Sequence, residues 1–546
     1  MSITKIQKTS SSFTILGGGI AGLTTAYNLC KKLPHASKFK KPTITVVEAS
    51  DRLGGWIKSD KHKLSNGLDI LCEKGPRTLR LDGGRESMAM LELIDDLGIH
   101  DQVIFTPKSS PASTNRFVYY NKSLNSVPSK PIHIFSRISP AVRPVFRALF
   151  NDLLTKKNTP TDKTDESVAQ LLERRFGKKI DDCLSSAILA GIYGADSNKL
   201  SARMVLNRLW KADRLHGKVS TGINKAVEHS KNIIGKDSFL ISQLDIESKD
   251  WKTRYNSNAD FWQKVHSSSV LSFVDGIQTL SDAIYNNIKS QANIKIITQD
   301  PCVKINRPLS SQNTVSVKLQ SGLDIESGKV VNTVPLHQSK SFFENEALPK
   351  ILTSNEYSSI CLVNLTYQGK GICPVDGFGF LVPRDSWEEI GIIGVVFDSC
   401  CLPGQDRGSD ITRFTVMMGG PTYEKMFKSN QSIQNDNLVS IATRSIKKAL
   451  GITADPIHVD SSVLEDCIPL FSVNYHEQLA EYHTWLQSWN GSLFVTGAAF
   501  GGPGINPIIL HAKDAATQLL SDLNIGSFKH NYDKPFTGLD VITKLY

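Results

Sequence analysis

The sequence predicts a protein of the α/β plus α+β class with more than one domain, because 546 residues exceed what one compact core holds. The segment 12–33 carries a short apolar strand, a glycine-rich turn and a helical pattern, as nucleotide-binding α/β units do. Residues 312–451 alternate apolar and polar side chains, which indicates an antiparallel sheet. Residues 165–214 are rich in helix formers, which indicates a helical insert.

The composition argues against some classes of function. The chain is 40% hydrophobic and 21% charged, and none of its apolar runs approaches the ~20 residues that cross a bilayer. The net charge of +10 suits an anionic lipid surface or an acidic small molecule. The sequence shows no zinc finger or RNA-binding signature, so we expect no nucleic-acid partner.

The nine cysteines indicate neither a disulfide framework nor a metal site. They include no C-x-x-C pair, and the adjacent Cys400 and Cys401 are too close in sequence for an unstrained disulfide. We expect reduced thiols that pack as small apolar residues. The thirteen histidines show no metal-ligand spacing either, so we expect no metal.

A glycine fingerprint follows the first strand. Residues Ser12–Leu16 read as a strand that enters a G-x-G-x-x-G turn and then a helix to about Leu33. Such glycines permit a tight turn, approach of the backbone to a pyrophosphate and close helix–strand packing. The turn residues are Gly17, Gly18, Gly19, Ile20, Ala21 and Gly22. An ordinary structural turn is the alternative to a dinucleotide site.

A second strand, Ile44–Val47, ends in Glu48, and an acid at this position can accept hydrogen bonds from both ribose hydroxyls. The residues after it include Ala49, Arg52, Gly54, Gly55 and Trp56. This segment resembles the E-x-x-x-R-x-G-G motif of the flavin amine-oxidase superfamily, which runs along the FAD diphosphate. The resemblance implies that Arg52 neutralises phosphate charge and that the glycine pair allows close backbone approach. It favours FAD over NAD.

A second cofactor-facing segment lies near the C-terminus. Residues Leu493–Ala499 read as a buried strand, and a glycine run leads to a helix from about Ile508 to Leu520. The superfamily closes its site with such a segment, whose helix N-terminus can stabilise negative charge on reduced flavin. The residues expected here are Gly497, Pro503, Gly504 and Ile505. The alternative is a glycine loop that merely caps a helix.

Several further motifs resemble those of the protoporphyrinogen oxidases, a family within this superfamily. Residues Glu73–Arg80 look like its E-x-G-P-R segment, which passes the flavin through Gly75, Pro76, Arg77 and Thr78. Residues Asn115–Phe117 look like its N-R-F segment, and Gly377–Pro383 like its G-F-G-x-L-x-P strand. Residues Cys302–Lys304 match the middle return of the FAD domain, with Val303 on the cofactor. The likeness covers nearly the whole chain in one order.

The resemblance also implies a substrate pocket. Arg116 offers a planar fork for a propionate, which a lysine cannot match. Phe378, Leu381 and Met417 would supply apolar walls, and Gly379 would let the substrate lie against backbone. From composition alone, a surface salt bridge for Arg116 and strand core for Phe378 and Leu381 are the alternatives.

The implied reaction oxidises protoporphyrinogen IX to protoporphyrin IX in haem biosynthesis. It comprises three rounds of hydride transfer to FAD, with O2 as electron acceptor and H2O2 as product. Monoamine oxidases of the same superfamily link their flavin covalently to a cysteine in the C-terminal region. Because no cysteine follows Cys467 here, we expect one non-covalent FAD per chain. We identify no catalytic side chain, because the flavin carries the chemistry. A homodimer and a contact with ferrochelatase are further expectations from the resemblance.

A basic segment separates the motifs. The segment from Asn121 to Pro160 contains seven Lys and Arg residues but only one acidic residue, Asp152. After Pro144, apolar residues recur at helical spacing through Leu153, as in an amphipathic helix that lies in an anionic interface. Packing of this helix into a helical domain is the alternative. The resemblance favours peripheral attachment to the inner mitochondrial membrane.

These observations predict a chain that alternates between domains. The Rossmann-like FAD-binding domain takes 1–104, 271–310 and 456–546; the substrate domain takes 105–122, 216–270 and 311–455; the helical, basic, membrane-associating insert takes 123–215. The polar stretch Lys252–His266 reads as a loop.

Two other classes of function stay open. One is a flavin oxidase of amines or polyenes, which would favour an aromatic cage or an apolar tunnel without Arg116. The other is a non-catalytic binding protein on a flavoprotein fold, as prenyl-GTPase escort proteins are. Such proteins discard the cofactor signature, whereas this chain keeps Gly17, Gly19 and Glu48.

Overall fold

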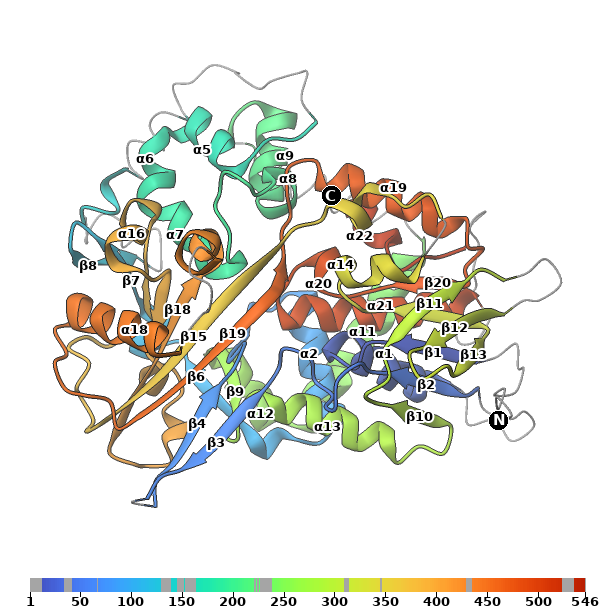
Figure 1. Cartoon of the computed structure of the whole chain (residues 1–546), viewed down its shortest axis with the longest axis horizontal. Helices are drawn as coiled ribbons and strands as arrows, with labels where there is room; N and C mark the ends of the chain where they lie inside the picture. Colours follow the sequence, from blue (N-terminus) through green and yellow to red (C-terminus); the bar gives the residue numbers. More distant parts are fainter. Residues whose placement is uncertain are drawn as a thin grey trace.

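The structure is a computed structural model that describes most of the chain. The described residues are 12–33, 42–65, 67–128, 139–144, 152, 164–219, 222, 225, 238–308, 314–343, 346–428, 435–522 and 535–545. The amphipathic helix expected after Pro144 therefore lies outside the described residues, except for Asp152. Figure 1 shows a nucleotide-type α/β half on the right, a large sheet on the left and a group of helices at the upper left.

The α/β half is built on a five-stranded sheet in the order β10-β2-β1-β14-β20, with every pair parallel. Its strands are β1 (Phe13–Leu16), β2 (Ile44–Val47), β10 (Ile294–Ile297), β14 (Lys329–Asn332) and β20 (Leu493–Val495). Strands β1, β2 and β20 are buried throughout, as expected where both faces of a parallel sheet are covered.

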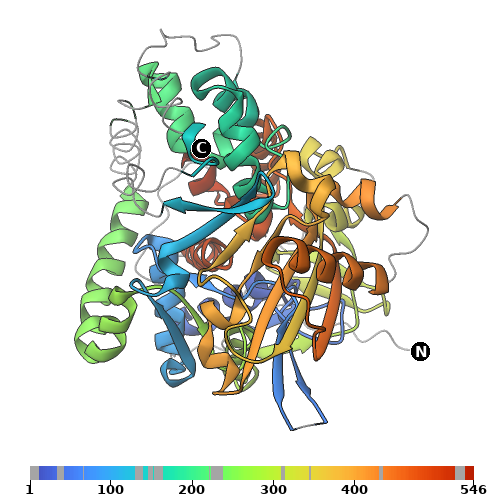
Figure 2. The same cartoon turned by 90° about the vertical axis from the view of Figure 1, so that its left-hand side faces the viewer.

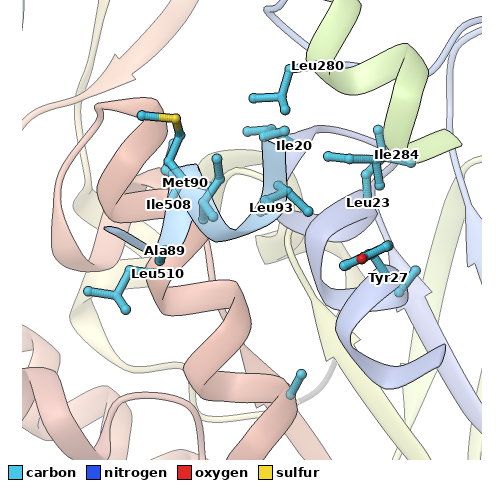
Figure 3. Close-up of a cluster of buried hydrophobic side chains, with 14 of the residues drawn as sticks. Ile20, Leu23, Tyr27, Ala89, Met90, Leu93, Leu280, Ile284, Ile508 and Leu510 are labelled. Atoms are coloured by element: carbon cyan, nitrogen blue, oxygen red, sulfur yellow. The ribbon is translucent and has the colours of Figure 1, made fainter. Parts of the chain in front are cut away.

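Helices cover one face of this sheet. They are α1 (Ile20–Lys32), α2 (Arg85–Asp96), α13 (Gln278–Lys289) and α21 (Ile505–Asp522). Figure 3 shows Leu23 of α1 near Ile284 of α13, while Met90 of α2 meets Ile508 of α21. These four helices come from three distant parts of the sequence, so their shared apolar core holds the nucleotide half together.

The other face is covered by an antiparallel sheet and by helices from the middle and the C-terminal part of the chain. The sheet contains β11 (Cys302–Asn306), β12 (Val315–Leu319) and β13 (Asp324–Ser327), and the helices are α14 (Leu336–Ser339), α15 (Lys350–Ser354), α19 (Tyr475–Gln487), α20 (Ala498–Gly501) and α22 (Asp540–Leu545). We expected 311–455 to lie wholly in the substrate domain. That boundary is wrong, because β12 and β13 pack in this core and β14 pairs with β1.

The second half is built on a seven-stranded sheet in the order β19-β15-β18-β17-β16-β7-β8. Its strands are β7 (Asn115–Tyr120), β8 (Ser123–Pro128), β15 (Tyr357–Gln368), β16 (Gly379–Leu381), β17 (Gly394–Val396), β18 (Ile411–Gly419) and β19 (His458–Pro469). The predicted antiparallel sheet is present, but β7 and β16 pair parallel because they come from remote segments and no hairpin joins them. Helix α18 (Asn435–Leu450) packs Leu438 and Ile446 against this sheet.

Smaller elements surround the two halves. The hairpin β3 (Ser59–Lys63) and β4 (Asp69–Glu73) projects from the lower edge in both views (Figures 1 and 2). A three-stranded sheet contains β5 (Leu79–Arg80), β6 (Val103–Pro107) and β9 (Ser268–Phe273). Short helices are α3 (Pro111–Thr114), α16 (Trp387–Ile390) and α17 (Asp398–Cys401).

The helical insert contains α5 (Val168–Phe176), α6 (Lys178–Ile180), α7 (Ser186–Tyr193), α8 (Ala202–Val205) and α9 (Asn207–His216). Helix α5 begins in a capping box in which the Ser167 and Gln170 side chains exchange hydrogen bonds with each other's backbone. The fully buried Arg175 forms an ion pair with Asp213 of α9, which ties the first helix to the last. The predicted start at 123 is wrong, because β8 pairs with β7 in the large sheet.

The loop expected at Lys252–His266 is also wrong. Helix α11 (Ser238–Ser257) and helix α12 (Ala259–Ser267) occupy this region, and the Asn258 side chain caps the second. The sequence looks polar because much of α11 faces solvent, while Phe261 and Trp262 of α12 are buried. No helix among the described residues has both the length and the apolar character of a membrane span.

Candidate active site

The glycine turn between β1 and α1 brings backbone N–H groups to one place. Gly17 has a φ of 99° and its N–H donates to Val47 O at 2.8 Å. A Cβ on Gly22 would lie 1.9 Å from Gly17 O, so only glycine permits this packing of helix against turn. The N-cap residue Gly19 provides no side-chain cap and the first turn of α1 carries no acid. The N–H groups at this helix start are therefore suited to phosphate oxygens.

Glu48 lies beside the turn, as predicted. Its Oε2 accepts the Gly18 N–H at 2.6 Å, and its Oε1 accepts the Ser50 N–H at 2.9 Å. The Asp300 N–H donates to Glu48 O at 3.3 Å, which brings the start of β11 alongside. Val303 on β11 is 38% exposed, an apolar side chain that a bound cofactor could cover.

The segment after Glu48 crosses the turn closely. The Gly54 N–H donates to Gly18 O at 2.9 Å, and a Cβ on Gly55 would lie 3.2 Å from Gly19 Cα. Arg52 donates to Gly55 O at 2.6 Å and to Ile57 O at 2.5 Å. The guanidinium therefore fixes the backbone of the glycine pair, a contribution that the motif alone did not indicate.

The C-terminal segment closes the site from the opposite side. Gly497 has a φ of 138° and precedes α20, and the buried Tyr475 donates from its hydroxyl to Ala499 O at 2.7 Å. Asn506, in the first turn of α21, donates to Arg80 O at 2.8 Å, but its buried Oδ1 has no hydrogen-bond partner among the described residues. The same holds for the buried Thr496 Oγ1. Tyr475 thus supports the closing loop through its hydroxyl.

These features fit a bound dinucleotide. The start of α1 has no side-chain cap, and the glycine turn before it leaves no room for side chains. Two buried polar atoms, Asn506 Oδ1 and Thr496 Oγ1, have no hydrogen-bond partner among the described residues, which is rare unless a ligand binds there. Trp56, predicted on the cofactor, is 44% exposed, so a bound cofactor could cover it as it could cover Val303. The residues present would hold an FAD by its phosphates at α1, by its ribose at Glu48 and by its ring system towards α21.

The segment Glu73–Thr78 joins the nucleotide half to the large sheet. A Cβ on Gly75 would lie 2.4 Å from Trp56 O, so the two predicted cofactor segments touch. Arg77 Nη1 lies 3.2 Å from Asp398 Oδ1, and Thr415 Oγ1 donates to Asp398 Oδ2 at 2.7 Å. Arg77 is therefore a buried link between the halves, a role that the sequence did not predict.

Burial raises the pKa of Glu73 to about 7, although hydrogen bonds from Ser59 and the Ile277 N–H favour its charged form. Its Oε1 accepts the Ile277 N–H at 2.8 Å, which ties the end of β4 to the start of α13. The carboxyl holds the base of the hairpin in place immediately before the Gly75–Arg77 segment.

The predicted substrate residues come together on the large sheet. Arg116 of β7 lies over the Phe378 ring at 5.7 Å from its centroid, and Phe378 and Met417 both pack against the small cluster around Val396. A Cβ on Gly394 would lie 2.9 Å from Leu381 Cδ2 and 3.0 Å from Met417 Cε. The predicted apolar wall is thus continuous from Arg116 to Leu381.

Gly379 has a φ of 145°, and a Cβ there would lie 2.0 Å from Val395 O. This strand pairing, rather than substrate approach alone, requires a glycine at that position. A Cβ on Gly191 of α7 would lie 2.6 Å from Leu381 Cδ2, so the helical insert borders the same wall.

A second arginine was missed. Burial, and after it the positive charge of Arg80, lower the pKa of Arg116, so the charge of Arg80 acts on this site. Arg80 is the last residue of the Glu73–Arg80 motif, and the resemblance assigned no role to it. Its positive charge next to a cofactor segment could have indicated an anion-binding role. The site therefore presents two cations beside an apolar wall.

Comparison with known proteins identifies the family. The fold and the site define a flavin containing amine oxidoreductase, and the model of the family with that description matches residues 20–520. The protoporphyrinogen oxidase of Schizosaccharomyces pombe is 31% identical over 525 residues, which cover 94% of this chain and 100% of that protein. The Homo sapiens protoporphyrinogen oxidase is 27% identical and the match covers 93% of this chain and 98% of that one. The chain belongs to this family, the protoporphyrinogen oxidases, and its cofactor is FAD.

Solved structures agree on the fold. A crystal structure from Exiguobacterium sp. 255-15, assigned provisionally as a protoporphyrinogen oxidase, has a TM-score of 0.70 at 18% identity and covers 94% of this chain. The match takes in 99% of that chain. Cyclohexylamine oxidase from Brevibacterium oxydans has a TM-score of 0.62 at 15% identity, with 94% and 99% covered.

Proposed function

We propose that this chain oxidises protoporphyrinogen IX to protoporphyrin IX in haem biosynthesis, with O2 as electron acceptor and H2O2 as product. The observation that carries the proposal is the Arg116 guanidinium over the Phe378 ring, beside the wall of Phe378, Leu381 and Met417. Such a site suits an apolar macrocycle that carries carboxylates better than it suits a neutral amine or a polyene. The names of the relatives support the same substrate.

The chain's own residues would bind and orient the substrate. Arg116 would take one propionate, and we propose Arg80, whose charge acts on Arg116, for the other. Phe378, Leu381 and Met417 would hold the ring system and exclude water from it. Bound FAD supplies the electron acceptor, so these residues need only present the reacting carbon in one orientation.

We also propose that the cofactor contacts are those predicted from the sequence. The FAD-binding domain would comprise 1–104, 271–310 and 470–546, extended by β12, β13 and β14 from the predicted substrate segment. Its last part would begin after residue 469 rather than at 456, because β19 pairs with β15 in the large sheet. The unpartnered Asn506 Oδ1 and Thr496 Oγ1 support a ligand at the C-terminal segment. The substrate domain would keep 105–122 and most of 311–455, with β8 added.

Peripheral attachment to the inner mitochondrial membrane is a finer part of the proposal. The net charge of +10 and the exposed Ile188, Ile192 and Leu215 of the insert support it. A relative from Nicotiana tabacum is named as a mitochondrial protoporphyrinogen oxidase. An anionic leaflet would attract the chain, and the exposed side chains would enter its interface.

One experiment tests the central proposal. The purified protein is examined by visible absorption, and protoporphyrinogen IX is then added under air. We expect a flavin spectrum, porphyrin fluorescence that grows above the non-enzymatic control, and release of H2O2. A flavin spectrum without porphyrin formation would reject the substrate and direct the search to amines and polyenes. A colourless protein that takes up no added FAD would favour a binding protein instead.

A further inference from the structure

Three potential metal ligands meet where the β3–β4 hairpin lies against β19. His62 of β3, Cys72 of β4 and His458 of β19 each offer one ligand atom, and these atoms all lie within 4.8 Å of one another. The two imidazole centroids are 4.6 Å apart, with the rings tilted by 44°. The residues are 396 positions apart at most, so no spacing in the sequence could indicate the cluster.

The register of the strands explains why these side chains converge. His62 pairs with Ile70 and Cys72 pairs with Asp60, which puts His62 and Cys72 on the same face of the hairpin. Asn364 of β15 donates to Glu73 O at 3.2 Å, and Lys74 forms an ion pair with Asp460 of β19. These contacts seat the hairpin on the large sheet, with its ligand-bearing face towards the start of β19.

The ligand atoms are buried and lack partners within the described residues. The Nε2 atoms of His62 and His458 are both buried with no hydrogen-bond partner, and Cys72 is 1% exposed. Asp460 Oδ2, two residues after His458 on the same face of β19, is also buried without a partner. Buried polar atoms in folded proteins nearly always have partners, so three orphans at one place indicate a missing ligand.

We propose that His62 Nε2, His458 Nε2 and Cys72 Sγ bind one Zn²⁺. Imidazole nitrogen and thiolate sulfur are the ligands that zinc prefers, in tetrahedral geometry with bonds of roughly 2.0–2.3 Å. A water completes the coordination and donates a hydrogen bond to Asp460 Oδ2. Binding forms one Zn–S and two Zn–N bonds, and the Cys72 thiol gives its proton to solvent.

We assign the site a structural role because of its position in the fold. It joins the projecting hairpin to β19, and β4 leads directly into the Gly75–Arg77 segment of the proposed FAD site. Zinc therefore restrains the base of that segment. The three ligands lie on β3, β4 and β19, outside the proposed substrate pocket. A zinc measurement therefore tests this proposal separately from the proposed oxidase activity.

Zinc binding is measured on the FAD-loaded protein. The protein is stripped with EDTA, dialysed against Zn²⁺, and analysed for zinc by elemental analysis and for affinity by competition with a chromophoric chelator. We expect one zinc per chain, with affinity reduced at least roughly tenfold to a hundredfold in His62→Gln, His458→Gln and Cys72→Ser. The controls are His266→Gln and Cys373→Ser, a histidine and a cysteine outside the cluster.

Substitution with Co²⁺ identifies the sulfur ligand. We expect a thiolate-to-cobalt absorption band that Cys72→Ser abolishes and Cys373→Ser retains. The flavin spectrum and circular dichroism report whether each variant folds; if Cys72→Ser does not fold, His62→Gln and His458→Gln decide the question. Equal zinc in ligand variants and controls, or no uptake by the stripped protein, would overturn the proposal and leave a bridging water between the imidazoles.

Discussion

Two arginines contribute the positive charge of the proposed pocket. Arg116 donates to Ser113 O at 3.4 Å and lies over Phe378, so its guanidinium is already oriented on the apolar wall. The positive charge of Arg80, from β5 in a different sheet, lowers the pKa of Arg116. The two cations therefore repel each other, and a dianionic substrate would relieve this repulsion.

Replacement of either arginine should weaken substrate binding and leave FAD bound. A hydrogen bond to a charged group contributes about 1.5–3 kcal/mol, so Arg116→Ala should lower kcat/KM by roughly tenfold to a hundredfold. Arg80→Ala should do the same, and Arg116→Lys should fall between because it keeps the charge but not the fork. Steady-state kinetics with protoporphyrinogen IX measure each effect.

The matched control for these variants is Lys122→Ala, which removes an exposed cation from the turn between β7 and β8. Its kinetics should equal those of the wild type. If Arg80→Ala also matched the wild type, the second propionate would not bind at Arg80, and if Arg116→Ala did so, the pocket would lie elsewhere.

Residue types could be predicted from the sequence where local motifs define them. The turn Gly17–Gly22 and Glu48 lie together as expected, because a strand–turn–helix unit is a local structure. The partners of Arg77 could not be predicted, since Asp398 is 321 residues away. The cluster of His62, Cys72 and His458 could not be predicted either, because His458 is far from the other two in the sequence.

At the scale of elements, the hairpin and α13 are joined by one buried carboxyl. Glu73 ends β4 and accepts the Ile277 N–H next to the start of α13, and its pKa rises from 4.5 to about 7 because it is buried. The folded state therefore binds a proton that the unfolded state releases between these two pH values. The free energy of unfolding should fall as pH rises through this window, by about 3 kcal/mol in total from this group.

Glu73→Gln should remove this pH dependence, because glutamine cannot ionise. The melting temperature of the variant minus that of the wild type should increase from pH 5 to pH 8, since only the wild type must bury a charge at the higher pH. Thermal unfolding at several pH values measures this difference. The control Glu388→Gln alters an exposed carboxylate and should show a flat difference; a flat difference for Glu73→Gln would contradict the raised pKa.

Elements with strong apolar patterns were predicted well, and those whose packing depends on charge were not. Strands β1, β2 and β20 lie where their apolar runs indicated. The C-terminal part of α11 was predicted to be a loop because its sequence is polar. In the structure, Arg254 in this part forms ion pairs with Asp95 and Asp96 of α2, and sequence polarity alone does not reveal such pairs. β14 was placed in the wrong sheet, because a short apolar strand does not identify its neighbours.

At the scale of the whole molecule, the helical insert connects an exposed apolar surface with the proposed substrate wall. Ile188 and Ile192 lie one turn apart on α7 and are 37% and 56% exposed, while Gly191 between them faces Leu381. A membrane at this surface would meet the protein close to the pocket. A poorly soluble porphyrin could then pass between bilayer and pocket without crossing much water.

The double variant Ile188→Asp/Ile192→Asp should therefore bind membranes less well. Each isoleucine contributes at most about 1.5–3 kcal/mol when buried, so partial burial of both predicts at least a roughly tenfold loss of affinity for anionic vesicles. Co-sedimentation with vesicles that contain cardiolipin measures the loss. FAD content should not change, because the glycine turn and Glu48 belong to the β1–α1–β2 unit and not to α7.

The control must carry the same change of charge, because two new carboxylates alone weaken attraction to an anionic surface. Ile246→Asp/Ile457→Asp adds two carboxylates at exposed isoleucines outside the insert. If α7 enters the interface, the insert variant should lose more affinity than this control, and the excess should persist at high salt, where charge effects are screened. Equal losses in the two variants would assign membrane binding to net charge alone and remove α7 from the interface.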